Sequence, residues 1–208
     1  MSNINNCEVK RWVNWFLPFY LLAFLPLLTS CSEQDDAVSE FSDWQQKNET
    51  YFEQQYQAHS VQSDTKFVVP SWKQASSKAL KDIEHTECVL VDVLEKGPDS
   101  ETDCPLYTDS VQVHYSGRLI SSAHYASGYE FDKSYLTTFD PEVDVPSEFL
   151  LSGNIVSGFS TALQHMHRGD HWRVIIPYQL GYGISEYNSI PGYSTLIFDI
   201  RLVDFWNP

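Results

Sequence analysis

Apolar and polar residues follow two different periods between residues 151 and 183. Four apolar side chains recur at the i, i+3, i+4 and i+7 spacing of one helical face: Phe159, Ala162, Leu163 and Met166. Ser157 is a suitable N-cap for this helix, and Gly169 is a suitable residue to end it. From Trp172 the period becomes two, and Pro177 closes the resulting strand. The stretch therefore predicts a helix and then a strand, with an aromatic Gly-Tyr-Gly loop just beyond them.

Further strands are predicted on both sides of this stretch. β-Branched or alternating apolar runs occupy residues 88–94, 111–115, 149–151 and 196–202, and an extended segment is expected at 67–70. A long loop is expected between residues 133 and 146. Because several strands accompany only one clear internal helix, without regular alternation, we predict an α+β fold with an antiparallel sheet.

A second helical pattern covers residues 39–58. Its stripe is partly aromatic and consists of Phe41, Trp44, Asn48, Tyr51, Phe52 and Gln55. Such a stripe has to be buried. We expect it to pack on the main domain, and a homodimer formed through this helix is the alternative. Residues 41–86 are therefore assigned to a helical N-terminal extension and residues 87–208 to the main domain.

Residues 1–30 have the order of segments that is typical of a secretory signal peptide. Lys10 and Arg11 precede an apolar run, 12–28, which contains two prolines and is short for a membrane-spanning helix. The run ends in Leu28-Thr29-Ser30-Cys31, which resembles the lipobox of bacterial lipoproteins. That resemblance implies that Cys31 is lipidated and begins the mature chain. A signal cleaved elsewhere and an uncleaved membrane anchor are the alternatives.

The mature chain is strongly acidic. Removal of residues 1–30 takes away Lys10, Arg11 and Glu8, which changes the net charge from −15 to −16. Such a surface repels phosphate backbones, so no nucleic acid is expected as a partner. Residues 31–40 form an acidic tether, either a solvated linker or a surface-export signal. We expect an outer-membrane lipoprotein of the cell envelope, on its periplasmic or surface face.

Cysteine usage is consistent with export. Cys7 is lost with the signal and Cys31 is taken by lipid, which leaves Cys88 and Cys104 as an even pair. In an oxidising compartment these two can form a disulfide, although spacing alone does not show that they meet. The histidines at 165, 167 and 171 do not share one face, so we expect no metal site and no cofactor.

Five short motifs occur together in the second half of the chain. They are Val113-His114-Tyr115-Ser116-Gly117, Phe131-Asp132, Ile155-Val156-x-Gly158-Phe159, Leu180-Gly181-Tyr182-Gly183 and Ile190-Pro191-x-x-Ser194-Thr195-Leu196-Ile197-Phe198-Asp199. In this order and at this spacing they resemble the FKBP-type peptidyl-prolyl isomerases, over roughly residues 88–205. Each motif alone carries little information, and their joint order carries the resemblance.

The resemblance implies a twisted antiparallel sheet wrapped around one short helix, with an aromatic pocket between them. It implies that catalysis involves Tyr115, Asp132 and Tyr182. It implies that substrate is bound by Phe131, Ile155, Val156, Phe159, Ile190 and Phe198. The expected partners are exported polypeptides that contain proline.

This residue set suits rotation about an X–Pro bond. Rotation breaks amide resonance but moves no proton and cleaves no covalent bond. An apolar slot with a few fixed hydrogen bonds favours the twisted, less polar amide. Hydrolysis would instead require a nucleophile paired with a base.

The chain departs from the family pattern at three places. Phe159 stands where many active members have tryptophan. Residues 137–148 are long and acidic, and within them Ser147 stands where an aromatic residue is usual. The 183–190 loop is slightly short. A non-catalytic chaperone or binding module on the same fold is therefore the alternative function.

Overall fold

The computed structural model describes residues 39–74, 79–98 and 103–208. The predicted signal peptide, Cys31 and most of the acidic tether lie outside these residues. Residues 38–208 form one compact unit with its own core. Within the described residues, no helix has both the length and the apolar character needed to cross a membrane.

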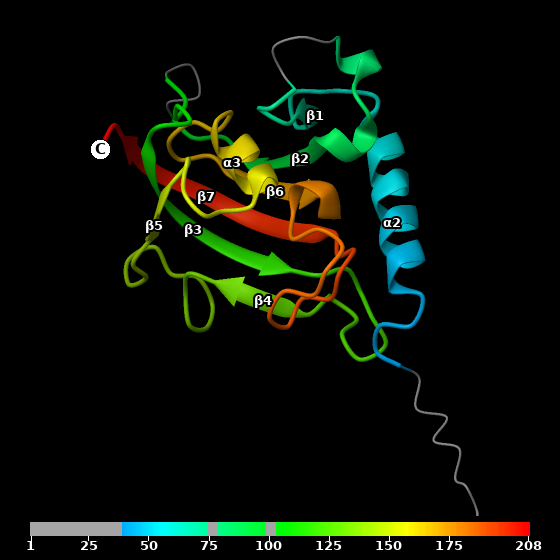
Figure 1. The fold of residues 1–208 in the computed structure, drawn as a ribbon. Coiled ribbons are helices and arrows are strands. Elements are labelled where there is room, and N and C mark those ends of the chain that lie inside the picture. Colours follow the sequence, from blue (N-terminus) through cyan, green and yellow to red (C-terminus); the bar gives the residue numbers. More distant parts are fainter. Residues whose placement is uncertain (1–38, 75–78, 99–102) are drawn as a thin grey trace, which may run out of the picture. The chain divides into compact units, whose positions relative to one another are not determined.

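One antiparallel sheet forms the body of this unit (Figure 1). Its strands are β1 (Lys66–Pro70), β2 (Cys88–Glu95), β3 (Ser110–Arg118), β4 (Glu130–Lys133), β5 (Ser147–Leu150), β6 (His171–Ile176) and β7 (Leu196–Trp206). The strand order is β1-β2-β6-β7-β3-β4, and β5 also pairs with β3. The helices are α2 (Trp44–His59) and α3 (Ser157–Leu163), with short 3-10 turns at Leu80–Asp82, His85–Glu87 and Tyr178–Leu180. The predicted α+β class and antiparallel sheet are confirmed.

Helix α3 packs on one face of the sheet. A side chain at Gly158 would lie 2.3 Å from Ile176 Cγ2, so the glycine lets the helix approach β6 closely. The predicted Ser157 cap is wrong, because the capping residue is Val156 and the Ser157 hydroxyl instead donates to the Leu180 carbonyl at 3.3 Å. This contact ties the start of α3 to the turn before residues 181–183.

Helix α2 packs on the opposite face. Phe52 lies in a second apolar cluster with Leu90 and Ile175, whose side chains point away from α3 because they alternate with the residues that contact it. Trp44 and Asn48 are buried as well. The predicted packing of this stripe on the main domain is therefore observed, with the helix beginning at Trp44 rather than at residue 39.

The two cysteines Cys88 and Cys104 do not meet, so the disulfide that the sequence left open is not formed in the structure. Both are free thiols. Cys88 begins β2 and is buried beneath α2, where its sulfur contacts the Glu84 carbonyl. Cys104 contacts His167 in the turn before β6, which pairs with the far end of β2. The length of β2 separates them by about 20 Å, whereas a disulfide needs Cα atoms within about 7 Å.

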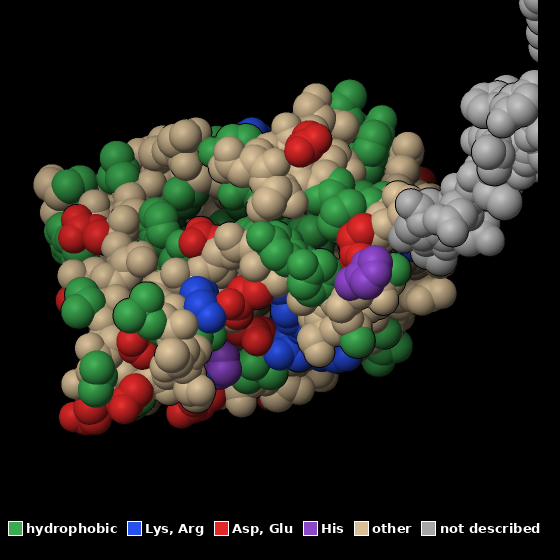
Figure 2. Space-filling model, turned by 90° about the horizontal axis from the view of Figure 1, so that it is seen from below, with side chains coloured by type: hydrophobic (Ala, Val, Ile, Leu, Met, Phe, Trp, Pro, Cys, Tyr) green, Lys and Arg blue, Asp and Glu red, His purple; other side chains and the backbone are tan. Residues whose placement is uncertain are grey.

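Charges of both signs lie side by side on the face shown in Figure 2. Salt bridges cross the sheet between Arg173 and Asp199 at 2.7 Å and between Arg201 and Glu95 at 3.0 Å. Each of these two arginines is thus paired with a carboxylate of another strand.

Candidate active site

A cluster of aromatic rings fills the space between α3 and the sheet. Phe159 of α3 lies 5.1 Å from Phe198 of β7 and 5.8 Å from both Tyr115 of β3 and Phe149 of β5, measured between ring centroids. All these pairs have the edge-to-face geometry that aromatic rings prefer. Phe159 is only 4% exposed. The cluster therefore forms a rigid apolar floor.

Gly117 makes room for this floor. A side chain here would lie 2.6 Å from the Phe198 ring and 2.7 Å from the Phe131 ring. The glycine that ends the predicted strand motif thus allows two aromatic rings to cross β3. Gly117 lies within β3, which continues to Arg118.

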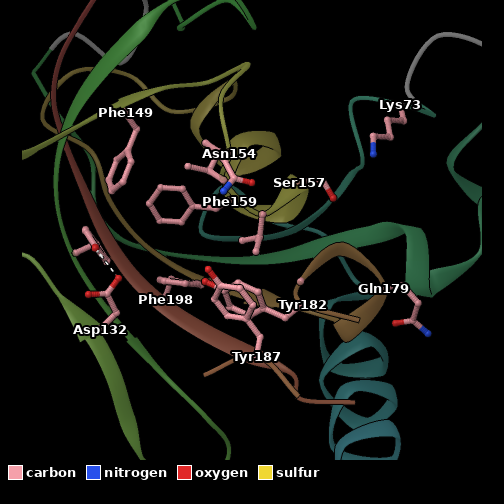
Figure 3. Close-up of a pocket in the computed structure, with 14 residues that line it drawn as sticks. Lys73, Asp132, Phe149, Asn154, Ser157, Phe159, Gln179, Tyr182, Tyr187 and Phe198 are labelled. Carbon is pink, nitrogen blue, oxygen red and sulfur yellow. Dashed lines mark hydrogen bonds between the residues drawn. The ribbon is translucent and has the colours of Figure 1, made fainter. Parts of the chain in front are cut away.

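A carboxylate and a phenol are joined at one side of the floor. The Tyr115 hydroxyl donates a hydrogen bond of 2.7 Å to Asp132 Oδ2, the dashed line in Figure 3. Burial raises the pKa of Tyr115, and the hydrogen bond to Asp132 raises it further. The phenol therefore remains a donor and fixes the carboxylate at the pocket.

Tyr182 and Tyr187 stand together at another side of the pocket (Figure 3). Their rings are stacked, with centroids 4.5 Å apart and planes at 7°. Burial raises the pKa of Tyr182, and the charges of Tyr187 and Asp132 add to this effect. Tyr182 therefore also stays protonated at neutral pH and can donate to a carbonyl.

These groups line an open pocket of about 630 Å³. Seven of the nine residues predicted for the site line it: Tyr115, Asp132, Ile155, Val156, Phe159, Tyr182 and Phe198. The two others do not. Phe131 packs edge-on against Phe198 at 5.5 Å, and Ile190 is 4% exposed within the main core. Ile190 belongs to the main hydrophobic core and Phe131 packs against it, outside the pocket lining.

The sequence-based prediction missed part of the lining. The additional residues are Lys73, Phe149, Asn154, Ser157, Gln179, Gly181 and Tyr187. Phe149 could have been found, because Ser147 and Phe149 lie on the same side of a strand and the aromatic ring was expected at 147. Lys73 could not, since it comes from the N-terminal extension and reaches the pocket only through the fold.

The lining is suited to binding and orientation rather than to bond cleavage. No histidine or cysteine is among the residues described around this cavity. Nowhere in residues 39–74, 79–98 and 103–208 do three His, Cys, Asp or Glu side chains meet in a geometry for metal binding. The polar side chains of the lining are phenols, a carboxylate, two amides, the Ser157 hydroxyl and the Lys73 amine, around an apolar floor.

A sheet that packs around one short helix, with an aromatic pocket between them, is the architecture that the motifs of the sequence implied. Residues 103–203 match the family model described as FKBP-type peptidyl-prolyl cis-trans isomerase. The matched segment contains all five motifs of the sequence, so the family match and the motifs point to the same resemblance.

Relatives of known sequence agree with this match. The chain is 38% identical over 100 residues to a "Macrophage infectivity potentiator" of Trypanosoma cruzi, a match that covers 48% of this chain and 44% of that protein. It is 34% identical over 129 residues to the FKBP-type isomerase FkpA of Buchnera aphidicola, covering 62% of this chain and 47% of the relative. The chain thus spans less than half the length of these relatives.

Two crystal structures share the fold. A peptidyl-prolyl cis-trans isomerase from Pseudomonas syringae gives a TM-score of 0.52 at 22% identity, over 81% of this chain and 97% of that one. FkpA from Escherichia coli gives 0.54 at 24% identity, over 80% and 63%. Lys73 and α2 lie outside the segment that matches the family model.

Proposed function

We propose that this protein is a peptidyl-prolyl cis-trans isomerase that acts on X–Pro bonds of exported polypeptides. The observation that carries the proposal is the pocket itself. An apolar aromatic floor at Phe159 lies between a fixed carboxylate, Asp132, and a protonated phenol, Tyr182. The second support is the match of residues 103–203 to the FKBP-type isomerase family model.

The chemistry follows from the barrier of the reaction. The X–Pro amide rotates slowly because twisting it costs resonance energy, with a barrier of about 18–20 kcal/mol. The twisted amide is less polar than the planar one, so an apolar floor around Phe159 favours it over the ground state. Each 1.4 kcal/mol or so of preferential binding gives about a tenfold higher rate.

Two polar groups would hold the peptide while the bond rotates. The Tyr182 hydroxyl is placed to donate to a carbonyl that flanks the proline. Asp132 is held by Tyr115 and would orient the polar groups of the twisting amide. Neither group has to exchange a proton, which suits phenols whose pKa is raised.

A coupled assay with proline peptides tests the proposal. The chain from residue 32 should accelerate cis-to-trans conversion above the uncatalysed rate. Tyr182→Phe should lower kcat/KM about tenfold, because one hydrogen bond in the twisted state is lost. Tyr125→Phe removes the hydroxyl of an exposed tyrosine outside this pocket and should change nothing. A chain with no activity above background, with Tyr182→Phe and Asp132→Ala indistinguishable from it, would refute the enzyme proposal.

A non-catalytic chaperone is the second candidate, and one surface feature favours it. The segment between β4 and β5 exposes Leu136, Val143 and Val145 at 91%, 74% and 78%. Apolar side chains of this kind can hold unfolded chains. Suppression of aggregation of a proline-free client, without any isomerase activity, would favour this candidate over the enzyme.

We further propose that the protein is an outer-membrane lipoprotein anchored through Cys31. The support is the basic and apolar order of residues 1–30 and the lipobox-like residues 28–31. The aromatic stripe of α2 packs on its own chain. It therefore does not need a second copy of the chain for its burial, which was the main reason to expect a homodimer. Sedimentation of residues 32–208, with and without 32–60, tests dimerisation directly.

A further inference from the structure

Three chemically reactive side chains meet outside the isomerase pocket. Cys104 Sγ lies 3.4 Å from His167 Nε2, and His167 Nδ1 lies 3.5 Å from Asp170 Oδ2. None of the three lines the pocket. Cys104 is partly exposed, whereas the Asp170 side chain is only 3% exposed. A nucleophile, a base and a buried carboxylate are therefore arranged in sequence.

The turn that carries the histidine is fixed on the sheet. Gly169 N–H donates to the Leu202 carbonyl at 2.8 Å, and Leu202 N–H donates to the Asp170 carbonyl at 3.0 Å. The Asp170 carboxylate accepts the backbone N–H groups of His167 and Gly97, each at 2.8 Å. These bonds explain Asp170 as a residue that stabilises the turn. They do not explain why the His167 ring faces a thiol.

The order of the three groups gives each ring nitrogen a different role. A carboxylate beside Nδ1 favours the tautomer in which Nδ1 carries the proton. In that tautomer the Nε2 lone pair of His167 faces the sulfur and can accept its proton. A nucleophile next to a base that a third group orients is the general arrangement of activated cysteines and serines.

Because of the charges around Cys104, its thiol needs a general base in order to react. Burial raises the pKa of the Cys104 thiol, and the negative charges of Asp170 and Asp103 raise it further. At rest the group is therefore a thiol, which needs a proton acceptor before it can attack. A thiolate derived from a weakly acidic thiol is also intrinsically the stronger nucleophile.

Cys88 provides the contrast within the same chain. Its side chain is fully buried, its sulfur contacts the Glu84 carbonyl, and burial raises its pKa to about 11. Cys88 is thus an inert core thiol.

We propose that Cys104 is a reactive thiol that exchanges with disulfides of other molecules, with His167 as its general base and Asp170 as a positioning residue. In the exchange, His167 Nε2 takes the thiol proton and Cys104 Sγ attacks one sulfur of the disulfide. The new S–S bond forms as the old one breaks, and the leaving sulfur takes the electron pair and then the proton from His167. The product is a mixed disulfide on Cys104 and one free thiol.

A disulfide is the electrophile that this site suits best. The negative charge that develops during exchange is carried by the leaving sulfur atom, so no oxyanion has to be stabilised. Acyl transfer would need such stabilisation. The choice of partner rests on the proposed export, because a partly exposed, unpaired thiol in an exported protein meets disulfides as its natural reaction partners.

The test uses residues 32–208 with Cys88→Ala, which leaves Cys104 as the sole thiol. The chain is mixed with glutathione disulfide, and in a parallel arm with a peptide dimer linked by one disulfide. Adduct formation is followed by mass spectrometry across pH. The same chain unfolded in guanidinium gives the rate of Cys104 without its neighbours. We expect the folded chain to react at least about tenfold faster than the unfolded one near neutral pH.

The histidine variant separates activation from exposure. His167→Gln should lower the rate to that of the unfolded chain and replace the pH dependence of the imidazole with that of a plain thiol. Asp170→Asn should shift the imidazole step in the pH profile, which a purely structural role would not do. A folded chain that reacts no faster than the unfolded one in either arm, or a His167→Gln chain that reacts as fast as its parent, would overturn the proposal. A faster peptide arm would identify polypeptides as the source of the disulfide.

Isomerase activity serves as an independent readout. Cys104→Ala and His167→Gln should leave prolyl isomerisation unchanged, because neither residue lines the pocket. The two proposals can therefore fail separately.

Discussion

Phe149 occupies the side of the pocket next to Phe159. The two rings are 5.8 Å apart, and Phe149 also contacts Tyr115 at 5.7 Å. The smaller floor ring at 159 is therefore accompanied by a ring from β5 that packs against it. This arrangement explains how a phenylalanine floor can form a closed apolar surface.

A larger floor ring should consequently be destabilising in this chain. Phe159→Trp should lower the free energy of unfolding by about 1–3 kcal/mol, because the added atoms meet Phe149 and Phe198. Phe159→Trp combined with Phe149→Leu should recover most of the loss. Urea denaturation of the single and double variants measures both values. A fully stable single variant would show that the floor has unused space.

Tyr115 should make stability sensitive to alkaline pH. Its pKa is raised in the folded protein, so the stability that it contributes is fully present below the ordinary tyrosine pKa of about 10 and is lost as pH rises above it. Tyr115→Phe should be less stable at pH 8 by about 1 kcal/mol, because the hydrogen bond to Asp132 is lost. Its stability should then fall less steeply than that of the parent between about pH 10 and 11. Parallel slopes would show that other groups cause the alkaline loss.

At the scale of elements, the placement of α2 depends on two buried polar contacts. Asn48 Oδ1 accepts the Thr195 N–H at 2.7 Å, and Trp44 Nε1 donates to Ser194 Oγ at 2.8 Å. Both partners lie just before β7, whose Phe198 belongs to the pocket floor. Helix α2 thus braces the chain that enters the site.

Asn48→Ala should therefore destabilise the protein by about 1–3 kcal/mol, because it leaves the buried Thr195 N–H without a partner. Glu49→Ala changes the next, exposed residue and should cost less than about 0.5 kcal/mol. Thermal or urea unfolding distinguishes the two. Equal small effects would mean that water replaces the Asn48 contact.

The elements themselves were largely predictable from sequence. Periods of 3.6 and two located α3, β6 and β7, because each buries one stripe or face against the core. The ends were less predictable. Helix α2 begins five residues later than expected, at a point where Asp43 adopts a left-handed conformation. Such ends depend on contacts with distant chain rather than on local spacing.

At the scale of the whole molecule, the proposed lipid anchor on Cys31 should determine whether the protein is attached to membranes. Cys31→Ser should release the protein from membranes into the soluble fraction and abolish incorporation of labelled fatty acid, because the only acceptor thiol of the lipobox-like sequence is removed. Cys104→Ser provides the matched control and should change neither readout. Membrane retention of the Cys31→Ser chain would favour an uncleaved N-terminal anchor instead.

The sequence by itself determined the fold class and most of the pocket. The spacing of apolar residues specifies which faces must be buried, and the ordered motifs place Tyr115, Asp132, Phe159 and Tyr182 around one cavity. Only the tertiary structure decided the rest. It packed Phe131 against Phe198, outside the pocket lining, and brought Phe149 and Lys73 to the pocket. It put α2 on the second face of the sheet, separated Cys88 from Cys104, and set Cys104 against His167. These outcomes depend on which distant segments become neighbours, and no local pattern records that.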